Sequence, residues 1–139
     1  MSVPNPSMIQ LNDIKVGIIN VEIIKEMCTG MLPKNMDPPK IDLSLKSLLE
    51  QRIFYPLYPP QPETPIEYEQ IQNLYIQEQP DILITPSDLI QFVKQIDGCL
   101  CVNPGSIIKN DGAVTFCSLT IEPFNYQAYV STTLINYIQ

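Results

Sequence analysis

Two stretches of the sequence decide the fold: residues 81–89, Asp-Ile-Leu-Ile-Thr-Pro-Ser-Asp-Leu, and residues 98–106, Gly-Cys-Leu-Cys-Val-Asn-Pro-Gly-Ser. Each contains an unbroken apolar run, which predicts a short strand covered on both faces. Each run then ends in a polar loop that contains proline. In the second loop, Pro104 and Gly105 fit the two central positions of a type II turn, where glycine supplies the positive φ. Buried strands are therefore expected in the second half of the chain.

The N-terminal residues predict a β-hairpin. Residues 8–11 lead into Asn12 and Asp13, which both tolerate the left-handed backbone of a tight turn. Residues 14–18 then alternate apolar side chains with lysine and glycine, which is the period of a half-buried strand.

Two helices are expected after this hairpin. Asn20 is a suitable N-cap for the first helix, and Gly30 can close it. Asp42 is a suitable cap for the second helix. The second helix carries an apolar stripe at helical spacing, formed by Leu45, Leu48 and Leu49.

Residues 55–65 hold five prolines in eleven positions, so we expect an extended, polyproline-like segment. Two interpretations of the Pro/Tyr-rich segment at 54–65 remain open. It is either a rigid surface strap that packs on the chain's own core, or a docking strip for a partner protein. In the second case the possible partner contacts are Tyr55, Leu57 and Tyr58, because exposed tyrosines on a pre-extended chain make good anchors.

The remaining segments complete a mixed α and β pattern. Residues 66–76 form a short amphipathic piece, and residues 89–96 could be either helix or strand. Two further strands are expected at residues 114–121 and 126–138.

Composition excludes several classes of function. The chain has 139 residues with 8 basic and 15 acidic side chains, a formal net charge of −7. A fold that binds nucleic acid by itself needs a basic face, and this chain is acidic. DNA contact is therefore expected only indirectly, through a partner. The absence of histidine excludes serine–histidine and cysteine–histidine nucleophile pairs and histidine-bearing metal sites. A solvated acidic face is expected from Glu63, Glu67, Glu69, Glu78 and Asp81.

The cysteines and the N-terminus indicate a reducing intracellular compartment. The first eight residues lack the basic start and apolar run of a secretory leader, and no apolar stretch approaches the ~18 residues that span a bilayer. Free thiols that act as small core residues are expected at Cys28, Cys99, Cys101 and Cys117.

The two deciding stretches also carry a family resemblance. They are similar to the closing strands of calcineurin-like metallophosphoesterases, whose active members end one strand in Gly-His-x-His and the next in Asn-Pro-Gly-Ser. They resemble still more the family of B subunits of DNA polymerase alpha, in which the first strand ends in Pro-Ser-Asp/Glu-Leu. Residues 4–17 and 51–60 are similar to the same family, and the resemblance runs in order over residues ~4 to 122.

This resemblance implies an α/β (mixed α+β) fold, the C-terminal part of a metallophosphoesterase-like β-sandwich flanked by helices. Residues 1–139 would be the C-terminal portion of an inactive phosphoesterase-like domain, the last quarter of a full subunit. Ser87 and Leu89 would then stand at lost metal-ligand positions, where the active pattern has its two histidines. A neutral hydroxyl and an isobutyl group hold transition metals poorly, so neither catalytic activity nor a metal or other cofactor is expected.

The resemblance further implies a non-catalytic scaffold of the DNA polymerase alpha–primase complex, acting in the nucleus at the initiation of DNA replication. Its expected partners are the C-terminal domain of the polymerase catalytic subunit and primase, with no membrane contact. Ser106 departs from the family pattern, which usually has arginine after Asn-Pro-Gly. Two alternatives stay open: a divergent metallophosphoesterase and a standalone intracellular interaction module that uses the Tyr/Pro segment.

Overall fold

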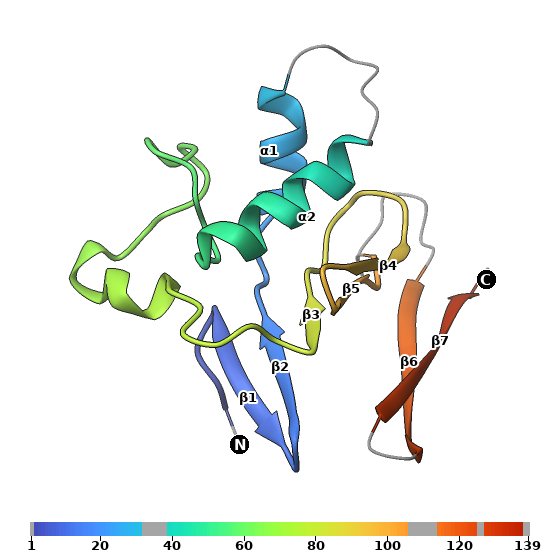
Figure 1. The fold of residues 1–139 in the computed structure, drawn as a ribbon. Coiled ribbons are helices and arrows are strands. Elements are labelled where there is room, and N and C mark those ends of the chain that lie inside the picture. The colour runs from blue at the N-terminus through green and yellow to red at the C-terminus, as the bar shows by residue number, and fades with distance from the viewer. Residues whose placement is uncertain (1, 32–38, 106–113, 125–126, 138–139) are drawn as a thin grey trace.

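The computed structural model describes residues 2–31, 39–105, 114–124 and 127–137. Figure 1 shows two helices above a small sheet, with a hairpin of two long strands beside it. The elements in chain order are β1 (Ser7–Leu11), β2 (Ile14–Ile18), α1 (Ile23–Gly30), α2 (Lys40–Gln51), the 3₁₀ helix η1 (Tyr68–Leu74), β3 (Ile82–Ile84), β4 (Phe92–Ile96), β5 (Cys99–Asn103), β6 (Val114–Phe124) and β7 (Gln127–Tyr137). The predicted mixed α and β fold is confirmed.

The main sheet has five strands in the order β1-β2-β3-β5-β4. Its three central strands, β2, β3 and β5, run parallel, and the outer strands β1 and β4 pair antiparallel to them. The predicted hairpin is confirmed, with Asn12 at φ +54° in its turn. The segment 89–96, which the pattern left open, ends in the strand β4. Gly105 has φ +85°, as the predicted type II turn requires, although Ser106 lies outside the described residues.

Both helices form where expected, but the predicted caps are wrong. Asn20 is held by Asn5 instead: its N–H donates to Asn5 Oδ1 at 2.8 Å and its carbonyl accepts from Asn5 Nδ2 at 3.1 Å. The helix α1 therefore begins later, at Ile23, and ends at Gly30 as predicted. The helix α2 begins at Lys40 after Pro39, which places Asp42 in its first turn. There the Asp42 carboxylate interacts favourably with the helix dipole, and its Oδ1 lies 2.6 Å from Lys94 Nζ.

One hydrophobic core fills the space between the helices and the sheet. The predicted stripe Leu45, Leu48 and Leu49 is buried in it, as are Leu83 of β3 and Cys101 of β5. The side chains of β3 and β5 that alternate with these, Ile82 and Val102, are buried on the opposite face. The prediction that both strands are covered on two faces is confirmed.

The cysteines divide into two pairs. Cys99 and Cys101 are fully buried on one face of β5, as predicted. The neighbouring Cys99 and burial raise the pKa of the Cys101 thiol. Cys28 and Cys117 are only half-buried, so the prediction of core positions is wrong for them. Cys28 lies at the edge of the core, where its sulfur is 3.5 Å from Ser44 Oγ.

The remaining segments agree with the sequence pattern. Residues 55–65 contain neither helix nor strand. β6 and β7 pair with each other in a second, two-stranded sheet. Among the described residues, no helix is both long and apolar enough to cross a membrane.

Candidate functional site

The carboxyl ends of the three parallel strands meet at one edge of the main sheet. The segments at this edge are residues 19–22 after β2, residues 85–89 after β3, and the last residue of β5, Asn103, with residues 104–105 that follow it. In open sheets with parallel strands, ligand sites gather at this edge, because the loops there converge from several strands. The residues singled out by the resemblance, Ser87 and Leu89, lie in the middle loop.

Asn103 ties two of these loops together. Its side chain is fully buried, and its Oδ1 accepts hydrogen bonds from the backbone N–H of Ser87 at 3.0 Å and of Gly105 at 2.9 Å. Its Nδ2 donates to the carbonyl oxygens of Leu89 and Ile90, both at 3.3 Å. Both ends of the amide are therefore used inside the chain.

Glu22 ties the loop after β2 to the loop after β3. Ser87 is 3% exposed, and its hydroxyl donates to Glu22 Oε2 at 2.7 Å. The other carboxylate oxygen, Oε1, accepts the backbone N–H of Asp88 at 2.8 Å. Ser87 Oγ also accepts the N–H of Leu89 at 3.2 Å. We call Glu22, Ser87, Asp88 and Asn103 the carboxyl-end cluster.

Neither predicted lost-ligand position presents a metal ligand. The Ser87 hydroxyl donates to Glu22 and accepts the N–H of Leu89. The Leu89 side chain is half-buried against the core. No group of three or more cysteine, aspartate or glutamate side chains among the described residues could hold a metal ion. The correspondence of Ser87 and Leu89 to lost ligands stays a prediction. The sequence analysis missed Glu22, although a carboxylate a few residues after the predicted strand at 14–18 was a signal that could have found it.

The Pro/Tyr-rich segment, residues 54–65, forms a strap across α1. Tyr55 is 4% exposed, and its hydroxyl donates to Glu26 Oε2 of α1 at 2.6 Å and accepts the N–H of Gln61 at 3.2 Å. Thr64 Oγ1 donates to the other oxygen, Glu26 Oε1, at 2.9 Å. Burial, followed by the hydrogen bond to the Glu26 carboxylate, raises the pKa of Tyr55. Tyr55 therefore packs inside the chain.

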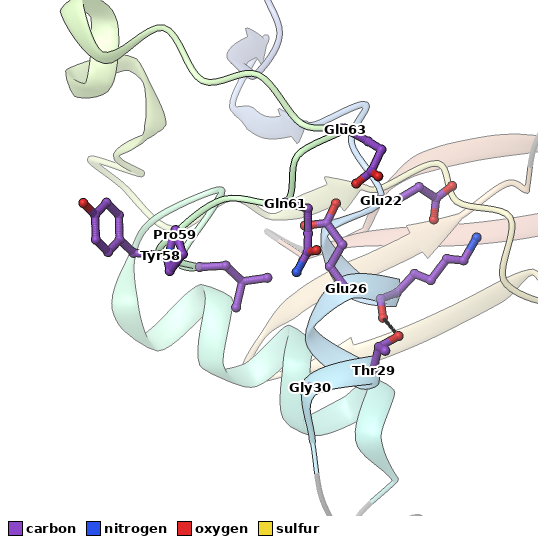
Figure 2. Close-up of a pocket in the computed structure, with 10 residues that line it drawn as sticks. Glu22, Glu26, Thr29, Gly30, Tyr58, Pro59, Gln61 and Glu63 are labelled. Atoms are coloured by element: carbon purple, nitrogen blue, oxygen red, sulfur yellow. Dashed lines mark hydrogen bonds between the residues drawn. The ribbon is translucent and has the colours of Figure 1, made fainter.

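The three possible partner contacts have different surroundings. Leu57 is half-buried against the core, whereas Tyr58 is 86% exposed and is the tyrosine of the strap that a partner can reach. Figure 2 shows that Tyr58 and Pro59 lie apart from the carboxylate of Glu26 in α1. That any of the three contacts a partner stays a prediction.

A groove of about 520 Å³ is lined by residues of the strap and of α1. Figure 2 shows three carboxylates gathered in one part of it, from Glu22, Glu26 and Glu63. Among the described residues that line the groove, Lys25 is the one cation, and its Nζ lies 3.6 Å from Asp88 Oδ2 of the carboxyl-end cluster. We call this the acidic groove. Its lining residues are Glu22, Lys25, Glu26, Thr29, Gly30, Leu57, Tyr58, Pro59, Gln61 and Glu63.

The predicted acidic face is confirmed as solvated. All five of its carboxylates are exposed: Glu63, Glu67, Glu69, Glu78 and Asp81. Glu78 forms an ion pair with Lys15, which lowers the pKa of Glu78 and raises that of Lys15. Asp81 Oδ2 accepts the backbone N–H of Lys15 at 2.8 Å.

Comparison with known proteins gives one consistent result. The family model for the B subunit of DNA polymerase alpha/epsilon matches residues 1–94. The DNA polymerase alpha B subunit of Mus musculus is 34% identical over 119 residues, covering 82% of this chain and 19% of the mouse protein. The corresponding B subunit of Schizosaccharomyces pombe is 34% identical over 130 residues, covering 86% of this chain and 22% of that protein. The chain thus spans about a fifth of the length of these relatives.

A solved structure with a weaker similarity is that of Chaetomium thermophilum Vps29. It aligns over 97% of this chain and 60% of its own, with a TM-score of 0.35 and 11% identity. This similarity is too weak to support any inference about fold or function.

Proposed function

The chain belongs to the family of DNA polymerase alpha/epsilon B subunits, and from this premise we propose that it is a non-catalytic scaffold piece of the DNA polymerase alpha–primase complex. Its place of action is then the nucleus, at the initiation of DNA replication. The relatives carry the name of a polymerase subunit, which supports a role in an assembly. The observation that carries the non-catalytic half of the proposal is the carboxyl-end cluster.

The cluster supports a structural role because its polar groups are consumed by the fold. The carboxylate of Glu22 accepts a hydrogen bond on each oxygen, and the amide of Asn103 accepts two and donates two. Metal-assisted phosphoester hydrolysis needs ligands that face an open site, so that a bound water can be activated. In this chain the loops after β2, β3 and β5 are hydrogen-bonded to one another instead.

The domain assignment is part of the same proposal: residues 1–139 are the C-terminal portion of an inactive phosphoesterase-like domain. The sheet face opposite the helices supports it. Ile82 and Val102 are buried on that face, and Ile18, Ile84 and Leu100 beside them are half-buried. Apolar side chains on both faces are typical of a sheet that forms one layer between two others.

Co-purification tests the scaffold role. The chain is expected to retain the C-terminal domain of the polymerase alpha catalytic subunit on a column, and to bring primase with it when that subunit is full length. The matched control is the C-terminal domain of the polymerase epsilon catalytic subunit, which should be retained less. No retention of the alpha domain would overturn the proposal.

DNA contact is proposed to be indirect, because a net charge of −7 opposes binding to phosphates. The chain alone should not shift a DNA duplex in a gel at about 50 mM salt, whereas its complex with the catalytic subunit should.

An activity assay tests the non-catalytic half. The chain should not hydrolyse bis(p-nitrophenyl) phosphate with manganese above the rate of Glu22→Gln, a variant that removes the one carboxylate of the cluster that faces Ser87. Hydrolysis by the wild type that Glu22→Gln abolishes would instead favour a divergent metallophosphoesterase.

A further inference from the structure

The acidic groove has one wall that is fixed before any partner arrives. Tyr55 and Thr64 donate to the two oxygens of Glu26, and Gln61 donates its N–H to Tyr55. These bonds hold the strap against α1 at two points, on either side of Tyr58 and Glu63. A preformed wall lowers the entropy cost of binding, because these residues are ordered already.

One end of the groove is apolar and open to solvent. Tyr58 is 86% exposed, next to Pro59, while Leu57 anchors the strap in the core. Tyrosine on a rigid backbone is a frequent hot spot in protein interfaces, because its large ring loses little freedom on binding. An apolar side chain of a partner would cover this ring.

The other end of the groove is negative. Glu22, Glu26 and Glu63 line it, while the charge of Lys25 is directed to Asp88. Glu63 is exposed, and the chain as a whole carries a net charge of −7. Such a groove repels nucleic acid and anionic lipid and attracts a cationic side chain. The occupant is therefore expected to carry a positive charge.

We propose that the acidic groove binds a cationic segment of a partner protein, with a lysine or arginine beside the exposed carboxylate of Glu63 and an apolar side chain on Tyr58. The charges of Glu22 and Glu26 attract this cation, although their oxygens are bonded within the chain. This proposal rests on the proposed function, because it assigns to the scaffold one of the surfaces by which it holds its partner. It also selects Tyr58 over Tyr55 as the contact residue of the strap.

Binding of the catalytic subunit's C-terminal domain to the full chain tests the groove with two variants. Tyr58→Ala should weaken the affinity at least about tenfold, and Glu63→Lys at least about fivefold. The matched controls are Tyr68→Ala and Glu69→Lys, exposed residues of η1 that do not line the groove, and both should bind as the wild type does. Raising the salt from about 50 to about 300 mM should weaken the wild type more than Glu63→Lys.

The outcomes separate the groove from the scaffold role. If the wild type binds the domain and both groove variants bind equally well, the groove proposal is overturned while the proposed function stands. If the wild type does not bind the domain, the proposed function fails. Binding to the groove is then tested with a labelled peptide of alternating lysine and leucine. A peptide of alternating glutamate and leucine is the control. Binding of the lysine peptide that Tyr58→Ala and Glu63→Lys abolish supports the groove, and equal or absent binding overturns it.

Discussion

The carboxyl-end cluster and the acidic groove lie side by side and share Glu22, yet they use polar side chains in opposite ways. In the cluster, Asn103 and Ser87 are buried and bonded within the chain. In the groove, Tyr58 and Glu63 face solvent. A polar residue in a loop where ligand sites are expected is therefore not by itself a site. The hydrogen bonds of such a residue within the chain show whether it stabilises the fold or is accessible to a partner.

Asn103→Ala gives the largest expected effect on this comparison. It removes four hydrogen bonds and leaves two buried backbone N–H groups without an acceptor, so the free energy of unfolding should fall by about 3 kcal/mol. Urea denaturation measures it. The control is Asn73→Ala, an exposed asparagine whose side chain donates to Gln70 Oε1, and it should change stability by less than about 0.5 kcal/mol. A loss below about 1 kcal/mol for Asn103→Ala would mean that the cluster does not hold the loops.

Ser87→Ala is expected to cost less, about 1–2 kcal/mol, because only the hydroxyl bonds to Glu22 and Leu89 are lost. Glu22→Gln should lower the free energy of unfolding less in the Ser87→Ala background than in the wild type, because Ser87 and Glu22 share one hydrogen bond. A double-mutant cycle in urea gives the coupling. Full additivity would show that the Ser87–Glu22 bond contributes nothing.

Tyr55→Phe tests the buried tyrosine of the strap. It should destabilise the chain by about 1 kcal/mol at pH 7, because it removes the hydrogen bond to Glu26. Because the folded chain raises the pKa of Tyr55, the stability from its hydroxyl is complete below the ordinary pKa of 10.0 and is lost as the pH rises through the folded value. The difference between wild type and Tyr55→Phe should therefore shrink as the pH rises above 10.0, in melts followed by circular dichroism. Tyr58→Phe is the control at pH 7, where it should change stability by less than about 0.5 kcal/mol because Tyr58 is exposed.

Tyr58→Ala gives the smallest expected effect on stability, a change within about 0.5 kcal/mol, because the ring is 86% exposed. Thermal melting measures it. A loss above about 1 kcal/mol would mean that Tyr58 supports the strap, and the contrast between the two tyrosines would disappear.

Local patterns predicted the parts of the fold that depend on neighbours in sequence. The N-terminal hairpin, the stripe on α2 and the buried runs of β3 and β5 all formed as expected, because period and burial determine them. The cap at Asn20 failed because Asn5, fifteen residues away, bonds its backbone. A local rule cannot anticipate such a competitor.

The candidate site was predictable only in part, for the same reason. Ser87 was found from a motif, but its bond to Glu22 joins residues that are 65 positions apart. Tyr55 and Tyr58 look alike in the sequence, and only the packing of the strap on α1 turns one inward and leaves the other outward. Contacts between distant segments therefore decided what the sequence left open.

The parallel pairing of β2 with β3 has a consequence for how the chain folds. Val16 pairs with Ile82, so both helices and the strap lie inside the loop that this pairing closes. Closing a long loop is slow, because its entropy is lost before any contact is made. The bond between Glu26 and Tyr55, only 29 residues apart, shortens that loop if it forms first. We expect Tyr55→Phe to slow refolding in stopped-flow experiments, whereas Asn103→Ala should mainly speed unfolding.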